Sequence, residues 1–189
     1  METVLSIMIG LGLSAACGFR VFVPLLVMSL ASRADIGQLM LGSGFSWIGS
    51  DAALIGFSVA TLLEIAGYYI PWVDNLLDAV ATPTAIVAGV LVSASAFSGD
   101  MSPFLQWSLA LLAGGGTTAV FQGVTATLRQ ISSFTTGGLG NPLVATAEAG
   151  GSAILAVLAI TLPIVAMLLV AGLLFFGVRR LLFRRPARA

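Results

Sequence analysis

Five ionisable residues lie within or beside long apolar stretches of this 189-residue chain. An ionisable group near the centre of a bilayer costs about 3 kcal/mol or more on insertion scales, so it is expected to pair, or to line a path for an ion or polar solute. These residues are Arg20, Glu64, Asp78, Arg129 and Glu148. We expect the two arginines to pair with Glu64 and Glu148. Such pairs either surround a polar cavity or simply hold helices together.

Two neighbouring segments add candidates for the same site. Asp74 and Asp78 lie four residues apart, on one face of a predicted short helix that follows Ile70-Pro71 and ends where Thr82-Pro83 begins a new helix. They either line a cavity mouth or form the wet face of an interfacial helix. The predicted substrate or ion path comprises Arg20, Glu64, Asp74, Asp78, Arg129, Thr135, Thr136, Gly140, Asn141 and Glu148.

Four of these candidates come from residues 132–142, which are rich in glycine, serine and threonine and lead to a predicted helix start at Asn141-Pro142. A glycine-rich loop before a helix offers free N–H groups to an anion, or carbonyls to a cation. The competing interpretation is a plain turn between two spans.

Missing residue types exclude much catalytic chemistry. The chain has no lysine and no histidine, which excludes Ser-His-Asp triads, HExxH zinc sites, P-loops and Schiff bases. Its single cysteine, Cys17, allows no intramolecular disulfide and no thiolate cluster. Gly99-Asp100 lacks the first glycine of the motif of intramembrane aspartyl proteases. We therefore expect no enzyme, no metal and no cofactor.

The composition is typical of a membrane protein. Hydrophobic residues make up 58% and charged residues 8%, with a mean hydropathy of +1.07, whereas soluble domains are about a quarter charged. A span needs about 20 apolar residues. The charge-free runs are 3–19, 52–63, 79–99, 101–128 and 149–178. Five spans result if Arg20 and Glu64 are tolerated in the first two.

Two of these segments are too long for a simple span, so each is expected to tilt or break. The predicted break points are Cys17-Gly18 and Pro24 in residues 3–31, and Gly150-Gly151 and Pro163 in residues 142–178. A break at Pro163 makes six spans in two halves, as in inverted-repeat transporters. The predicted fold is thus an all-α, polytopic transmembrane helix bundle of 5 to 6 spans, with broken or re-entrant segments near 17–24 and 132–150.

Small residues four apart predict where helices approach closely. Four such ridges are Gly10-Ser14-Gly18, Ala81-Ala85-Gly89-Ser93, Gly115-Ala119-Gly123-Thr127 and Gly56-Ala60-Glu64-Tyr68. The last ridge carries Glu64, which is therefore expected to face protein. Residues 164–178 are bulky and are expected to face lipid or a second subunit.

Charge asymmetry suggests an orientation. Five of the eight arginines lie in residues 179–189, which we interpret as a basic cytoplasmic tail on a single integral membrane domain, 1–178. Counting back through five spans places Arg33 in the cytoplasm and Met1-Glu2 outside. Arg129 then falls on the wrong side, which indicates that it is buried or paired. The start lacks a basic signal region, so we expect residue 1 to be retained.

The predicted location is the bacterial inner (cytoplasmic) membrane, with the C-terminus in the cytoplasm. Membrane lipids are the expected partners, and a homodimer that encloses a path is a hypothesis. No nucleic acid is expected, because the only arginine cluster is the tail.

Three motifs resemble a catalogued family. They are Cys17-Gly18-Phe19-Arg20 with Pro24-Leu25-Leu26; Glu64 with Ile70-Pro71, Asp74 and Asp78; and Ser133, Thr135, Gly137, Gly140-Asn141-Pro142-Leu143 and Glu148. This pattern resembles a bacterial membrane family known as domain of unknown function 4126, over nearly the whole chain, with Gly-Asn-Pro as its most specific part. The resemblance implies a small multipass protein and supplies no reaction.

Two functional hypotheses follow. The first is a transporter or channel-like protein for an ion or small polar solute. The alternative is a non-transporting scaffold or lipid-organising protein with structural ion pairs. A water-accessible cavity lined by Arg20 and Glu64 favours the first, and a dry, fully paired cluster favours the second.

Overall fold

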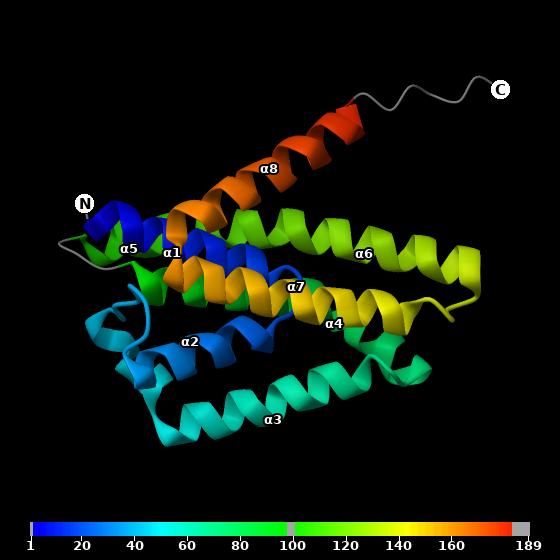
Figure 1. The fold of residues 1–189 in the computed structure, drawn as a ribbon, viewed down its shortest axis with the longest axis horizontal. Helices are drawn as coiled ribbons and strands as arrows, with labels where there is room; N and C mark the ends of the chain where they lie inside the picture. The colour runs from blue at the N-terminus through cyan, green and yellow to red at the C-terminus, as the bar shows by residue number, and fades with distance from the viewer. Residues whose placement is uncertain (1, 98–100, 183–189) are drawn as a thin grey trace.

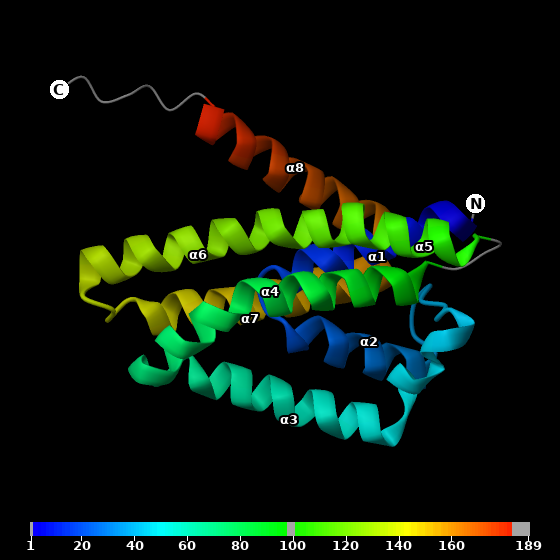
Figure 2. The same ribbon diagram turned by 180° about the vertical axis from the view of Figure 1, so that it is seen from behind.

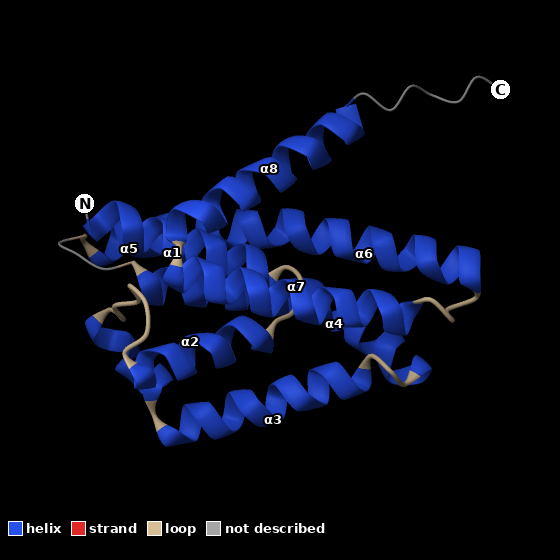
Figure 3. Cartoon of the chain, viewed as in Figure 1, coloured by secondary structure: helices blue, strands red, loops and turns tan. Residues whose placement is uncertain are grey.

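The computed structural model of the chain describes residues 2–97 and 101–182, and helices joined by short loops make up these residues (Figure 3). Asp100 and the tail residues 183–189 lie outside the described part. The helices are α1 (Glu2–Cys17), α2 (Phe22–Ala34), the 3₁₀ helix η1 (Ser43–Gly49), α3 (Asp51–Gly67), α4 (Pro71–Ala96), α5 (Pro103–Leu109), the π-helical segment η2 (Ala110–Gly115), α6 (Gly116–Thr136), α7 (Asn141–Thr161) and α8 (Pro163–Leu182).

The first two helices form a hairpin. α1 ends at Cys17, residues 18–21 turn, and α2 runs back beside α1 toward the end where the chain starts (Figure 1). The start of α1 and the end of α2 lie together, and we call this end of the hairpin the hairpin mouth. It contains a hollow of about 370 Å³ that both Glu2 and Asp35 line. At 1.5 Å per residue, α1 and α2 are about 24 Å and about 20 Å long, shorter than the about 30 Å of a bilayer core.

The hairpin confirms one prediction and overturns another. The break expected at Cys17-Gly18 is present, whereas Pro24 lies in the first turn of α2 and breaks nothing. Residues 3–31 are therefore two helices rather than one. Glu2 and Asp35 line the same hollow, so they lie at the same end of the molecule, whereas the predicted orientation placed Met1-Glu2 and Arg33 on opposite sides.

Long helices pack around this hairpin. Three are long and apolar enough to cross a membrane: Ala79–Ala96, Pro103–Thr136 and Asn141–Thr161. Shorter apolar helices are Glu2–Cys17, Phe22–Ala34 and Pro163–Phe176. α4, α6 and α7 extend along the long axis of the molecule, with α6 in contact with both α4 and α7, and α3 lies at the edge of the bundle (Figures 1 and 2).

Several expected helix boundaries are corrected. α4 is continuous from Pro71 and contains Pro83, so no new helix begins at Thr82-Pro83. Gly150-Gly151 lies inside α7, because the paired glycines cost helix propensity without preventing helical geometry. The second long segment breaks instead at Leu162, before Pro163, as predicted. Residues 132–136 are the last turn of α6 rather than loop.

α1 is the central helix, and hydroxyl groups of its neighbours bond its backbone carbonyls. Ser93 Oγ of α4 donates to Gly10 O at 3.1 Å, and Thr118 Oγ1 of α6 donates to Ser14 O at 2.7 Å. Ser152 Oγ of α7 donates to Ala16 O at 2.9 Å. Small residues permit this approach at Gly10, Gly18 and Gly89, as two of the predicted ridges require. The other two ridges are not close contacts along their length, because a Cβ at Gly56 or Gly123 would meet nothing within 4 Å. Hydrogen bonds and close backbone packing thus fix which helices contact α1 and how they are aligned, a choice that burial of apolar side chains alone specifies poorly.

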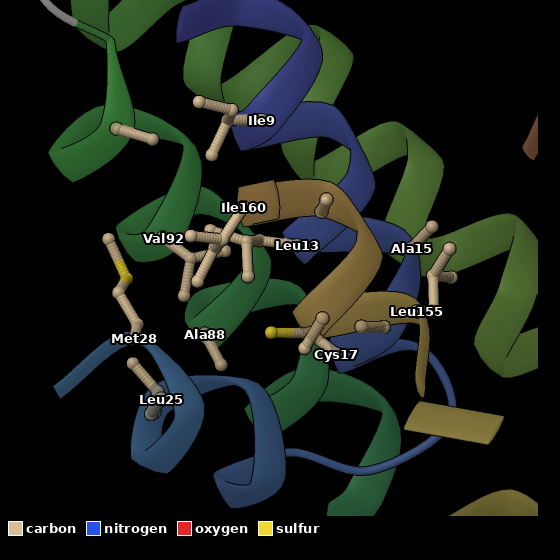
Figure 4. Packing of buried hydrophobic residues seen from close by; sticks show 14 of the residues in the cluster. Ile9, Leu13, Ala15, Cys17, Leu25, Met28, Ala88, Val92, Leu155 and Ile160 are labelled. Carbon is tan, nitrogen blue, oxygen red and sulfur yellow. The ribbon is translucent and has the colours of Figure 1, made fainter. Parts of the chain in front are cut away.

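An apolar core surrounds the same helix. Ile9 and Leu13 of α1 pack with Met28 of α2, Val92 of α4 and Ile160 of α7, each 0–1% exposed (Figure 4). The first half of α8 packs on this core through Ala166 and Val170, and the helix then diverges from it (Figures 1 and 2). Most of its larger apolar side chains, including Leu168, Leu173 and Phe176, are exposed, as expected for a helix that faces lipid or another subunit.

Ser14→Ala tests the polar contacts of α1. Ser14 Oγ lies 2.8 Å from Gly89 O and 2.6 Å from Ser93 Oγ. The substitution leaves buried polar groups without their partner, so we expect the free energy of unfolding to fall by about 1–3 kcal/mol. Denaturant titration in detergent micelles measures this. Thr127→Ala is the control, because exposed Thr127 bonds only its own helix, at Gly123 O; equal losses in both variants would contradict the interpretation.

Candidate functional site

The hairpin tip places Arg20 inside the protein. Its side chain leaves the turn between α1 and α2, and the residue is only 2% exposed. Nη2 donates to Ala145 O at 2.9 Å and lies 3.2 Å from Glu148 Oε2. Nε and Nη1 are buried and have no hydrogen-bond partner. A buried guanidinium therefore retains unused donors.

Glu64 of α3 contacts the same turn between α1 and α2, which forms the tip of the hairpin. The carboxylate reaches from α3 to the start of α2, where Oε1 accepts Val21 N–H at 2.8 Å and Oε2 accepts Phe22 N–H at 3.1 Å. The first N–H groups of a helix lack intrahelical partners and favour negative charge, so Glu64 caps α2. The sequence predicted an arginine as the partner of Glu64; its hydrogen bonds go instead to backbone amides.

Glu148 of α7 serves both arginines. Arg129 Nε of α6 lies 3.0 Å from each carboxylate oxygen, and Arg129 Nη2 also bonds Oε2. Arg20 adds a third cationic contact. Arg129 and Glu148 are 6% and 5% exposed, so water screens these charges little. The expected pairing of Arg129 with Glu148 is present. Because Arg129 is buried in this pair, it does not act as a positive charge in a loop, which explains why it falls on the wrong side in the predicted orientation.

Tyr68 is the member of the cluster that sequence reasoning missed. Both guanidinium groups lie over its ring, with Arg20 Cζ and Arg129 Cζ each 3.8 Å from the ring centroid. The π system of an aromatic ring attracts cations, so one ring helps to stabilise two buried like charges. A signal existed: Tyr68 follows Glu64 by four residues, on the same predicted ridge.

The predicted loop residues lie elsewhere. Thr135 and Thr136 end α6, and Gly140 and Asn141 start α7, at the end of the molecule opposite the hairpin mouth (Figure 1). Thr136 Oγ1 accepts Gly140 N–H at 2.9 Å, and Asn141 Nδ2 donates to Ser133 Oγ at 3.0 Å. These exposed bonds describe a turn, as the competing interpretation expected. Asp74 and Asp78 belong to α4, and their side chains lie outside the described part.

The structure thus brings together Arg20, Glu64, Arg129 and Glu148, with the ring of Tyr68 against both arginines. We call these five residues the tip cluster. Its formal charges balance, and all five are buried. The hollow at the hairpin mouth lies at the far end of α1 and α2, lined by Glu2, Ser6, Asp35 and Gln38 among others. Among the side chains that the structure describes, no group of three His, Cys, Asp or Glu residues is arranged to hold a metal ion.

Tyr68→Leu tests the stacking. Leucine fills similar space without a π face, so the two guanidinium groups lose their shared partner, and we expect about 1–2 kcal/mol less stability than in Tyr68→Phe. Both variants are compared by chemical unfolding in the same detergent. If phenylalanine and leucine are equally destabilising, the ring contributes packing and no cation–π attraction.

The fold and this cluster define an all-helical protein with three helices long enough to cross a membrane and a neutral charge cluster at the tip of a buried hairpin. The chain belongs to the family described as Domain of unknown function (DUF4126), whose sequence profile matches residues 7–182. This confirms the resemblance noted from its motifs. Comparison with curated proteins and with solved structures gave no significant match.

Proposed function

We propose that this chain is a multipass protein of the inner (cytoplasmic) membrane, with a cytoplasmic C-terminus, that moves an ion or small polar solute past the tip cluster. The observation that carries the proposal is the hairpin itself. α1 and α2 are each too short to cross a bilayer, and they meet at a turn that holds buried Arg20. Interrupted helices with irregular backbone at membrane depth are tolerated where protein buries them or where they line a cavity, and transporters use them as binding sites.

The unused donors of Arg20 support a binding role. A buried donor without a partner costs about 1–3 kcal/mol, and more when charged. A guanidinium kept only as a structural lock is expected to have its N–H groups satisfied. Nε and Nη1 of Arg20 are instead available to a ligand. This is the feature that separates Arg20 from Arg129, whose Nε and Nη2 both bond Glu148.

The scaffold alternative has a specific observation in its favour. Arg129 and Glu148 form a buried multidentate pair, and the charges of the cluster balance without a ligand. Such a pair holds α6 and α7 in register and needs no solute. In this alternative the cluster fixes the arrangement of helices that other membrane components then recognise.

Flux measurements in proteoliposomes distinguish the two. Purified protein is reconstituted and assayed with potassium, sodium, chloride and formate, each against protein-free vesicles. We expect flux of at least one solute, reduced about tenfold or more by Arg20→Gln. Arg33→Gln is the matched control, because Arg33 lies at the exposed end of α2, paired with Asp51. Background flux for every solute, with correctly folded protein in the vesicles, would favour the scaffold.

A further inference from the structure

We propose that the N-terminus of α2 and Arg20 form a binding site for a small monovalent anion of the carboxylate class, and that the Glu64 side chain occupies this site as a tethered substitute. The inference rests on the proposed function, since this anion is then the transported solute. It makes Glu64 a removable plug that competes with the anion.

The geometry of Glu64 is that of a bound carboxylate. Each oxygen accepts one of two successive backbone N–H groups, Val21 at 2.8 Å and Phe22 at 3.1 Å. Glu64 lies 43 residues from Val21 in the sequence, so it is not a local cap of the α2 segment. A helix N-terminus with two converging N–H groups binds free carboxylate or halide by the same chemistry.

Arg20 supplies the second, independent observation. It immediately precedes Val21, it is 2% exposed, and its Nε and Nη1 have no partner. Glu64 also interacts electrostatically with Arg20 and Arg129. On α3, Thr61 Oγ1 lies one turn before Glu64 and is likewise buried without a partner. In the proposed site an anion at the start of α2 uses the backbone donors and the unpartnered donors of Arg20, the residue that precedes them, whereas the carboxylate of Glu64 hydrogen-bonds the backbone donors.

Charge balance favours an anion that replaces the carboxylate of Glu64 over an anion that binds in addition to it. With Glu64 in place, two arginines face two glutamates. An added anion would leave one uncompensated negative charge in a buried site, which is strongly unfavourable. If the anion instead replaces the carboxylate of Glu64, the balance is unchanged. α3, which carries Glu64, lies at the edge of the bundle, outside the central helices (Figures 1 and 2). In the proposed exchange α3 moves outward with Glu64 while the central helices stay in place.

The test is whether removal of the plug creates affinity for formate. Binding of ¹⁴C-formate to purified protein in detergent is measured by equilibrium dialysis for wild type, Glu64→Ala and Glu64→Gln. We expect Glu64→Ala to bind formate at least tenfold more tightly than wild type. Glu64→Gln keeps the shape of the side chain and one acceptor oxygen, so it remains folded and binds with an intermediate gain. Adding Arg20→Gln to either variant should abolish the gain.

Ser50→Ala is the matched control. Ser50 caps α3 by accepting Ala53 N–H at 3.2 Å, so the variant also removes a helix cap, at a helix start whose neighbouring arginine, Arg33, is partly exposed and already paired with Asp51. Formate affinity should stay at the wild-type value. If neither Glu64 variant binds formate more tightly than wild type and Ser50→Ala, the anion site is refuted. If Glu64→Ala does not fold, Glu64→Gln alone decides.

The proposed function fails separately. A gain in formate binding without formate flux in vesicles leaves the anion site in place and contradicts transport. Flux of another solute that is indifferent to Glu64 supports transport and contradicts the plug. Formate flux that rises with Glu64→Gln is the outcome that both proposals expect.

Discussion

Glu148→Ala is expected to lower the free energy of unfolding by about 3–5 kcal/mol, the largest effect among substitutions in the tip cluster. The reason is that one carboxylate neutralises two buried guanidinium groups, Arg20 and Arg129. Its removal leaves both cations in a poorly solvated environment. Denaturant titration in micelles, with helix content as the readout, measures the loss.

The double variant Arg129→Gln/Glu148→Gln is the informative comparison. It removes the pair together, keeps the formal charge balanced, and leaves amides that can hydrogen-bond. We expect it to be more stable than Glu148→Ala, because breaking a buried pair on one side costs more than replacing both partners. If the double variant is less stable than the single one, the destabilisation comes from lost packing rather than from uncompensated charge.

Gly18→Val is expected to prevent the close approach of α1 and α6, with a loss of about 3 kcal/mol or more of stability. Overpacking in a dense interior typically costs 1–3 kcal/mol when side chains can yield. At Gly18 a Cβ would overlap Phe121 Cβ and would lie 2.9 Å from Thr118 O and 3.1 Å from Gln122 N. Backbone atoms cannot move aside as a flexible side chain does. The helix pair, and with it the hairpin tip, must shift.

Gly123→Ala is the control, on α6, the helix that Gly18 contacts. A Cβ at Gly123 meets nothing within 4 Å, and alanine is the better helix former, so stability should be unchanged or slightly raised. Thermal unfolding of both variants in one detergent gives the comparison. Similar behaviour of Gly18→Val and Gly123→Ala would mean that α1 and α6 do not approach as described.

Local patterns predicted the breaks but not the direction of the chain after them. At Cys17-Gly18 and at Pro163 the helix is interrupted by a local property of the chain, the flexible backbone of glycine and the missing N–H group of proline. That α2 folds back beside α1 depends on contacts distant in sequence, such as Glu64 with Val21 and Arg20 with Ala145. Composition and periodicity contain no such information. The count of five spans treated residues 3–31 as one crossing for this reason.

The site shows the same limit. Four of the charged members of the predicted path come together because an ionisable group in an apolar segment must find a partner. The identity of the partners was less predictable: Glu64 bonds backbone amides, and Tyr68 carries no charge that would have singled it out. The turn at residues 137–140 had the composition of an anion loop. Its exposed residues instead bond one another, and Gly137 and Gly138 adopt positive φ values that suit a tight turn.

The most direct test of the account is the sidedness of the hairpin ends. In a Cys17→Ala background, single cysteines at Glu2, Gln38 and Leu139 are labelled with a membrane-impermeant maleimide in sealed vesicles of known orientation. Glu2 and Gln38 line the same hollow, whereas Leu139 is 87% exposed in the turn between α6 and α7. We expect Glu2→Cys and Gln38→Cys to react from one side and Leu139→Cys from the other. Labelling of Glu2→Cys and Gln38→Cys from opposite sides would make residues 3–31 a single span and would contradict the buried hairpin.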